Sequence, residues 1–505
     1  MSNPQGPPVG DDDAAMAEGA MLDAAEAGEE IPSDPDAPME SDDEGGNDPT
    51  NGPLGDEEEI TIQNDSAAHF DAHTDSIFCI AQHPKHAEIV ATGGGDDVGY
   101  IFDTTPADTP VLPDSYRAAP GKPARDSIEP LFKLDGHTDS VNAVAFTRPS
   151  GDYVLSAGLD GRLRAWKDSS SDGCGRQWAF VAEMQEVEEI NWLLPCPHPD
   201  YPNTVGLGAS DGSVWVYTVN AEDEASPLTI VQALYLHTDS CTAGAWTPDG
   251  KLLATVSQDG SFYAFDVFGE AAAAGLVSVG EGGQAVVGLT AADQRFAVDG
   301  GLYSVAVSDT GVMAVVGGAG GNIKVVGLPR IGADPSVTAG AKGAGAESKT
   351  GGRKKAGGPS TAGSGVGSGQ AGQILASLQA QSDGVETLTF SPAPLNLLAA
   401  GSIDGSIAIF DTAHRFAVRR SIKEAHEEHA VVKVEFVEST QGGGWLLTSA
   451  GMDGVVRRWD TRSGTAALQG LLQEWKGHRG DGEGGGVLGF VQGGGGGRIV
   501  TAGDE

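Results

Sequence analysis

Cysteine is scarce in this sequence, and long apolar runs are missing. The four cysteines, Cys79, Cys174, Cys196 and Cys241, lie far apart and form no Cys-x-x-Cys pair, so the sequence indicates neither a disulfide framework nor a zinc site. No run of roughly 18 apolar residues and no apolar N-terminal stretch occurs, so we expect neither a membrane span nor a secretory signal. A reducing compartment follows as the expectation, and we predict a cytoplasmic protein, with a nuclear location also open.

Basic residues are also few. The chain has 30 Lys and Arg against 72 Asp and Glu, which gives a formal net charge of −42, and residues 1–60 alone hold 19 acidic residues and no Lys or Arg. This balance argues against direct binding to nucleic acid, which requires a basic surface. It favours a basic protein partner through long-range attraction. For the acidic N-terminus, solubility alone is an equally good interpretation.

The N-terminal segment lacks aromatic residues. Residues 1–58 are rich in Asp, Glu, Pro, Gly and Ala, and such a segment cannot bury enough apolar surface to offset the entropy lost on ordering. We therefore predict a disordered acidic tail over 1–58. The alternating residues Ile60-Thr61-Ile62 predict that regular structure begins near Glu59, so the folded domain is expected over 59–505.

The rest of the chain is built from repeats. His-Thr-Asp-Ser occurs at 73–76, 137–140 and 237–240, and each copy is followed about 22 residues later by an Asp in a tight turn and then by an aromatic residue. Short apolar strands at even spacing, with no helical pattern between them, predict an all-β propeller. The repeats predict eight blades. Glu505 stands where the third strand of the last blade would begin, so either the sequence is truncated or the last blade is incomplete and presents an open edge.

Two insertions stretch the repeat spacing. One is Pro-rich and covers about 104–127; the other is rich in Gly, Ser and Ala, covers about 332–372 and carries a cluster of basic residues. Both compositions predict mobile loops. The basic cluster is consistent with a nuclear-import signal or a patch for acidic ligands, but a solubilising insertion is the favoured interpretation.

Two repeats contain sets of residues that resemble a hydrolase triad. These sets are His137, Ser156, Asp160 and Trp166, and His426, Ser449, Asp453 and Trp459, with His429 as an alternative to His426. Related sets recur at the same repeat phase, whereas an active site needs one pocket. We therefore predict buried hydrogen-bond networks with a structural role. No nucleophile elbow or nucleotide-binding loop is present in a suitable context, so we expect no enzymatic activity, no cofactor and no metal.

Acidic residues recur just before the first strand of most repeats. In five repeats the acid precedes the apolar start of that strand by two residues, and in the seventh repeat two acids lie in the same loop. These loops open on one face of a propeller, so the acids are expected to form a ring that attracts positive charge. A role in local turns alone is the competing interpretation. The candidates are Asp75, Asp139, Glu188, Asp239, Asp383, Glu427 and Glu428.

The repeats resemble WD-repeats through Gly136-His137, the Asp-Gly turns and Trp459-Asp460. Several segments resemble the angio-associated migratory cell protein family and its fungal ribosome-assembly chaperone relatives. These segments are residues 76–80 with 91–97, 188–192 and 399–411, and the acidic tail and the low-complexity insertion add to the resemblance. The resemblance implies an eight-bladed propeller that holds the basic N-terminal segment of a large-subunit ribosomal protein on an acidic face. The unfinished last repeat and the weak fifth repeat depart from the family pattern.

Two functions follow as hypotheses. The first is a monomeric, non-enzymatic chaperone that captures a basic large-subunit ribosomal protein during ribosome assembly. The alternative is a general WD-repeat scaffold in signalling, cytoskeletal or cell-migration complexes, in which the acidic ring matters less. Neutralising the ring would separate the two, because only the first requires it.

Overall fold

The structure is a computed structural model that describes residues 65–105, 127–170, 173–276, 285–331, 370–438, 444–462, 470–478 and 485–504. The predicted tail (1–58) and nearly all of the two predicted insertions (about 104–127 and 332–372) lie outside these residues. The described residues form antiparallel sheets with only short helical segments, such as α1 (Glu270–Ala273). The all-β prediction is therefore confirmed.

Seven sheets have four strands each, and in every one the strands follow chain order from the innermost to the outermost. Blades 1 to 3 are β1 (Ile77–Gln82), β2 (Ile89–Gly94), β3 (Gly99–Asp103), β4 (Pro130–Leu134); β5 (Val141–Phe146), β6 (Tyr153–Gly158), β7 (Arg162–Asp168), β8 (Trp178–Gln185); and β9 (Ile190–Pro195), β10 (Thr204–Ala209), β11 (Val214–Val219), β12 (Leu228–Leu234). Blades 4 and 5 are β13 (Cys241–Trp246), β14 (Leu252–Ser257), β15 (Phe262–Asp266), β16 (Ala285–Leu289); and β17 (Leu302–Val307), β18 (Met313–Gly318), β19 (Asn322–Gly327), β20 (Ile374–Gln379). Blades 6 and 7 are β21 (Val385–Phe390), β22 (Leu397–Ser402), β23 (Ile407–Asp411), β24 (Ala417–Ile422); and β25 (Val431–Phe436), β26 (Leu446–Gly451), β27 (Val455–Asp460), β28 (Leu471–Lys476).

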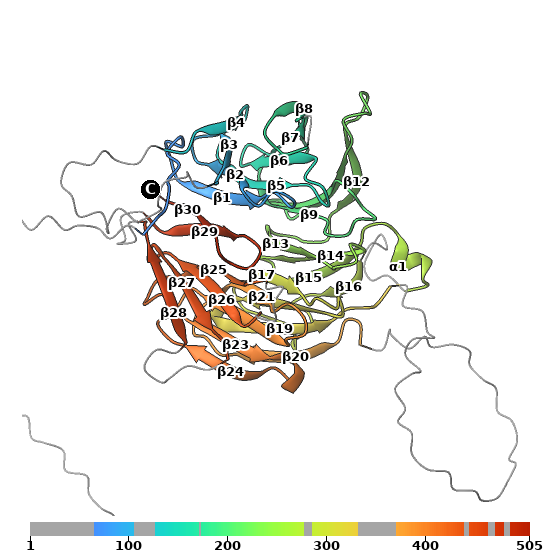
Figure 1. Cartoon of the computed structure of the whole chain (residues 1–505). Helices are drawn as coiled ribbons and strands as arrows, with labels where there is room; N and C mark the ends of the chain where they lie inside the picture. The colour runs from blue at the N-terminus through green and yellow to red at the C-terminus, as the bar shows by residue number, and fades with distance from the viewer. Residues whose placement is uncertain are drawn as a thin grey trace, which may run out of the picture. The chain divides into compact units, whose positions relative to one another are not determined.

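The predicted count of eight blades is wrong. The structure has seven four-stranded blades, and the remaining sheet consists of only two strands, β29 (Val487–Gln492) and β30 (Ile499–Gly503). The described residues supply no third or fourth strand to this sheet. The two strands nevertheless occupy a place in the ring, because β29 contacts both β25 of blade 7 and β1 of blade 1. In Figure 1 the red strands β29 and β30 accordingly lie beside the blue strand β1.

The core lies between neighbouring blades. The second strand of a blade is buried along its whole length in β2, β6, β10, β14 and β22. One apolar cluster, for example, joins Ile89 of blade 1 to Trp166 of blade 2. Because both faces of such a strand are covered, its sequence is continuously apolar or small rather than alternating. Burial of a large aliphatic or aromatic side chain of this kind contributes about 1.5–3 kcal/mol.

Glycines in the turns between second and third strands hold the loop that leads into the next blade. Gly161 has φ of 71°, and a Cβ atom there would lie 2.0 Å from the carbonyl oxygen of Val187. Gly405 has φ of 75°, and a Cβ atom there would lie 2.1 Å from the carbonyl oxygen of Glu427. Only glycine combines this backbone conformation with so close an approach. The Asp-Gly turns thus position the loops that carry Glu188 and Glu427.

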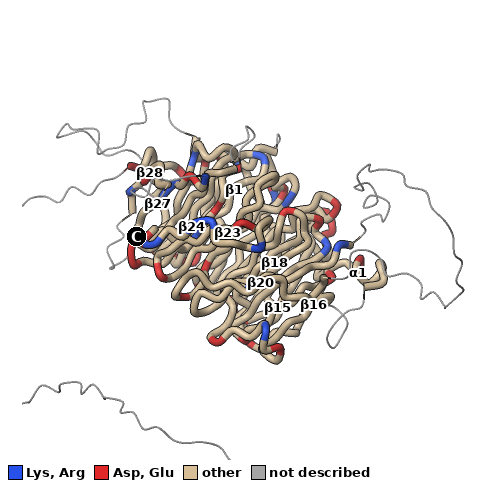
Figure 2. Tube along the Cα trace, turned by 90° about the horizontal axis from the view of Figure 1, so that it is seen from below, with Lys and Arg blue, Asp and Glu red and all other residues tan. Residues whose placement is uncertain are grey.

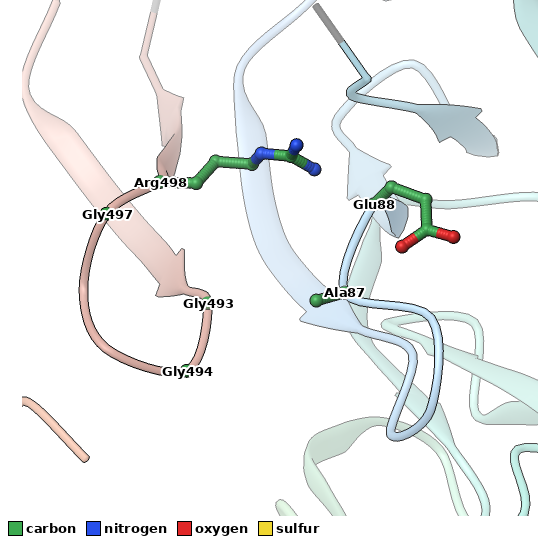
Figure 3. A pocket seen from close by; sticks show the side chains of 6 residues that line it. All are labelled: Ala87, Glu88, Gly493, Gly494, Gly497 and Arg498. Carbon is green, nitrogen blue, oxygen red and sulfur yellow. The ribbon is translucent and has the colours of Figure 1, made fainter. Parts of the chain in front are cut away.

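Segments from distant parts of the chain meet where the ring closes. The backbone N–H of Asp65 donates to the carbonyl of Lys476 in β28 (2.6 Å), and the N–H of Ile128 donates to the carbonyl of His69 (2.9 Å). A further contact lies at the other ends of the strands, away from the bond between Asp65 and Lys476. There Arg498, just before β30, extends toward blade 1 (Figure 3) and donates to the Thr104 hydroxyl (3.2 Å). These contacts connect the two-stranded sheet and blade 7 to blade 1.

Candidate partner-binding face

The predicted acidic residues all lie in leading loops, the residues just before each innermost strand. Asp75, Asp139, Glu188, Asp239, Asp383, Glu427 and Glu428 are all exposed. The innermost strand and the second strand of a blade are antiparallel neighbours, so each leading loop lies at the same end of its sheet as the Asp-Gly turn. We call this side the leading-loop face. In Figure 2, Asp and Glu lie mainly at the loops that bound the strands.

Four of these carboxylates also hold the local turn. The backbone N–H of the following residue donates to Oδ1 of Asp75 (2.7 Å), Asp139 (2.8 Å) and Asp239 (2.7 Å). Asp383 accepts from the N–H of Gly384 in the same way (2.7 Å). One oxygen of each carboxylate therefore fixes the loop, and the negative charge still faces solvent. The turn role and the charge role that the sequence left as alternatives are compatible in one side chain.

The charge of this face is not neutralised locally. Among the described residues, none of the seven predicted acids lies within 4.0 Å of a Lys, Arg or His nitrogen, whereas Asp160 and Asp453 in the turns pair with arginines. The leading loop of blade 7 also forms a shallow depression lined by Glu424, Glu427, Glu428 and His429. Unpaired exposed carboxylates at repeated positions create a negative potential that attracts a cationic ligand.

Further acidic residues of this face were missed from the sequence, and Glu386 and Asp299 show why. Glu386 is half-buried on β21, and its pKa is raised by burial and by the negative charge of Asp383. No loop pattern marks it, because its place on this face follows from the bulge in β21. Asp299 is exposed in the leading loop of blade 5. It was missed because it precedes Leu302 by three residues rather than two, with Gly300 and Gly301 between them.

The predicted triad-like sets are hydrogen-bond networks inside their own blades. His137 Nδ1 lies 3.0 Å from Asp160 Oδ1, and His137 Nε2 lies 2.6 Å from Ser156 Oγ. His426 makes the same contacts to Asp453 (2.8 Å) and Ser449 (2.7 Å). Trp459 Nε1 donates to Ser449 Oγ (2.8 Å), whereas the buried Trp166 packs against the Phe180 ring.

The electrostatics of these networks favour neutral histidines and charged aspartates. Burial lowers the pKa of His137 and of His426, although the adjacent Asp in each case acts in the opposite direction. Burial alone would raise the pKa of Asp453, but hydrogen bonds from His426 and Arg457 and the positive charge of Arg457 lower it to about 2. A neutral histidine then donates from Nδ1 to the carboxylate and accepts from the serine hydroxyl at Nε2. Each network ties a leading loop to the turn of its own blade, and a structural role remains the prediction.

The described part of the chain offers little for cofactor chemistry. No group of three or more His, Cys, Asp or Glu side chains in it is arranged to hold a metal ion. No helix in it is long and apolar enough to cross a membrane.

Besides the depression in the leading loop of blade 7, a second hollow lies at the opposite ends of the strands from the leading loops (Figure 3). Its lining includes Glu88, Gly493 and Arg498.

Comparison with known proteins gives a consistent set of relatives. The WD40 family (WD domain, G-beta repeat) matches residues 64–103, 128–167, 228–266 and 372–411. The crystal structure of Sqt1 from Chaetomium thermophilum is similar at 52% identity with a TM-score of 0.72, over 88% of this chain and 96% of that chain. A second crystal structure of that protein, with the same identity and TM-score and 98% of its chain covered, is bound to the N-terminus of ribosomal protein L10.

Two further relatives are more distant. The ribosome assembly protein SQT1 of Saccharomyces cerevisiae is 31% identical over 235 residues, which is 45% of this chain and about half (48%) of the yeast protein. The angio-associated migratory cell protein of Homo sapiens is 25% identical over 414 residues, 82% of this chain and 73% of that protein.

Proposed function

This chain belongs to the Sqt1 family of WD-repeat proteins, and we propose that it is a non-enzymatic chaperone in ribosome assembly. Its client is the basic N-terminal segment of a large-subunit ribosomal protein, and the leading-loop face is the binding site. The chaperone acts as a monomer in the cytoplasm, where it captures the newly made client before the client meets RNA.

The observation that carries this proposal is the set of seven exposed leading-loop carboxylates, none of which has a Lys, Arg or His nitrogen within 4.0 Å among the described residues. A basic segment that lies across the ring would meet acids from several blades at once. Exposed charge pairs contribute only about 0.2–1 kcal/mol each, so affinity must come from several of them together. Such binding is fast and weakens as salt rises.

The structure allows a charge change that leaves the loops intact. We would change Asp75, Asp139 and Asp239 to Asn in one variant, because an Asn Oδ1 still accepts the N–H of the next residue. The matched control changes Asp152, Asp200 and Asp223 to Asn. These three are exposed and lie in turns at the opposite ends of the strands, so both variants lose the same charge.

The experiment is a calorimetric titration of the full chain with a peptide that covers the basic N-terminus of the ribosomal protein, at low and moderate salt. We expect salt-sensitive binding by the parent and the control. The leading-loop variant should bind about 30-fold more weakly, if three pairs of about 0.7 kcal/mol each are lost. Equal binding by both variants would remove the ring from the proposal. No binding by the parent would favour the scaffold function instead.

A further inference from the structure

Every innermost strand of the ring is interrupted at the same point. In β1, Ile77 pairs with Gly94 and Cys79 pairs with Gly93, so Phe78 is left without a partner in the ladder. The same irregularity follows the first residue of all eight innermost strands, including β29. A bulge of this kind redirects the side chain of the extra residue. The extra residues are Phe78, Asn142, Asn191, Thr242, Tyr303, Glu386, Val432 and Leu488.

These bulge residues lie on the innermost strands, directly after the acidic leading loops. Together they surround the inner rim of the leading-loop face, which we call the mouth of the ring. Each follows the leading loop of its blade closely: Phe78 comes three residues after Asp75, and Glu386 three residues after Asp383. All eight side chains are half-buried or exposed. Their chemistry differs around the ring, and two arcs can be distinguished by what the side chains contact.

In blades 2 to 4 the bulge residues are polar and join neighbouring blades. Asn142 Nδ2 donates to the carbonyl of Asn191 (3.0 Å), and Asn191 Nδ2 donates to the carbonyl of Cys241 (2.9 Å). Thr242 Oγ1 donates to the carbonyl of Leu302 (2.7 Å). These side chains are already engaged within the protein, so this arc serves the ring itself.

In blade 7, the two-stranded sheet and blade 1, the bulge residues are apolar. Val432, Leu488 and Phe78 belong to β25, β29 and β1, which are consecutive neighbours in the ring. We call these three residues the apolar arc. Phe78 is 40% exposed although it lies on an innermost strand. Met452 packs closely against Gly486, which lies in the leading loop of β29 two residues before Leu488.

Acidic residues flank the apolar arc on both sides. Asp75 lies in the leading loop before Phe78, and Glu427 and Glu428 lie in the leading loop before Val432. The cation nearest along the chain, Lys433, is engaged by Glu435 (3.0 Å) and by the carbonyl of Phe490 (2.7 Å). A ligand that covers this region must therefore present apolar surface between positive charges.

We propose that the apolar arc is the specificity-determining subsite of the leading-loop face. It takes one large apolar side chain, aromatic or aliphatic, that stands among Lys and Arg residues in an extended client segment. This inference rests on the proposed function, and it adds a requirement that charge cannot supply. Carboxylates bind any basic segment, whereas a packed apolar contact at the centre of a face discriminates between segments of equal charge.

The test compares Phe78→Ser with the matched control Phe180→Ser. Phe180 is 50% exposed but lies on the outermost strand β8, away from the mouth. We expect Phe78→Ser to weaken binding of the basic peptide about 30-fold, since covering the exposed part of a ring of roughly 200 Å² removes on the order of 80 Å² of apolar surface from water. Phe180→Ser should bind like the parent. The salt dependence should stay unchanged in both, because neither variant removes a charge.

A second arm uses a peptide whose large apolar residues are changed to Ser with its charges kept. The parent should bind this peptide about 30-fold more weakly, and Phe78→Ser should show no further loss, as expected for two groups in contact. Val432→Thr, which keeps the branched shape, should weaken binding in the same direction if Phe78→Ser does not fold. Equal affinities of Phe78→Ser, Val432→Thr and the control would overturn the subsite while leaving the acidic face standing. A parent that does not bind the peptide at all would overturn both proposals.

Discussion

The buried His237 makes the stability of blade 4 depend on pH. It is 6% exposed, and its ring nitrogens lie 2.6 Å from Ser261 Oγ and 2.7 Å from Thr255 Oγ1. Burial lowers its pKa from 6.5 to about 4, and the charge of Asp259 offsets only part of this effect. Between these two values the unfolded chain binds a proton that the native protein does not, so acidification favours unfolding.

The contribution of neutral His237 to the free energy of unfolding is fully present above its unfolded pKa of 6.5, and it is lost as the pH falls toward about 4. At about 1.4 kcal/mol per pKa unit, the loss reaches about 3 kcal/mol. His73, His137 and His426 act in the same direction, because burial lowers the pKa of each of them below 6.5.

The assay is urea unfolding of the parent and of His237→Gln from about pH 7.5 to about pH 4.5. Gln is a sound replacement because Gln381 occupies the corresponding position of blade 6, buried and hydrogen-bonded to the Ser406 carbonyl (2.9 Å). Carboxylate titration affects both proteins alike, so the difference between their free energies of unfolding isolates His237. We expect that difference to shift against the parent by about 2–3 kcal/mol over this range. A difference that stays constant with pH would refute the reasoning.

Two further predictions concern the contacts that position the leading loops. Ser449→Ala should lower the free energy of unfolding by about 2 kcal/mol, and by more than Ser156→Ala. Ser449 Oγ bonds to both Trp459 Nε1 and His426 Nε2, whereas the side chain of Ser156 bonds, among the described residues, to His137. Equal losses in chemical denaturation would contradict this. Gly161→Ala should lower the free energy of unfolding by about 2 kcal/mol more than Gly260→Ala. Both glycines have positive φ, but their surroundings differ. A Cβ atom would lie 2.0 Å from the Val187 oxygen at Gly161 and 3.5 Å from the Val298 oxygen at Gly260. Matching melting temperatures for these two glycine variants would show that the clash is relieved freely.

The repeat architecture could be predicted because its signals are local. The phrase His-Thr-Asp and the Asp-Gly turn lie within one repeat, and their spacing predicts the positions of the His137–Ser156–Asp160 network and of the leading-loop acids. The number of repeats overstates the number of four-stranded blades. A repeat phrase marks a place in the ring, whereas a blade needs four paired strands, and the sheet that contains β29 has two.

The parts of the face that the sequence did not predict depend on pairing between strands. A bulge at Phe78 or Leu488 is defined by the register of the neighbouring strand, and no local residue pattern marks it. Glu386 was overlooked for the same reason, because its place at the mouth follows from the bulge in β21. The exposure of Phe78 on an innermost strand likewise depends on how the whole ring packs, which no single repeat determines.

The central claim is that the leading-loop face binds the basic client segment, and hydrogen exchange with and without the peptide tests it most directly. We predict slower exchange on binding in the leading loops around 72–77, 136–141 and 236–241. The turns at the opposite ends of the strands, around 147–152 and 247–251, should exchange at unchanged rates. Protection of those turns or of the outermost strands, with unchanged leading loops, would place the ligand elsewhere and contradict the account.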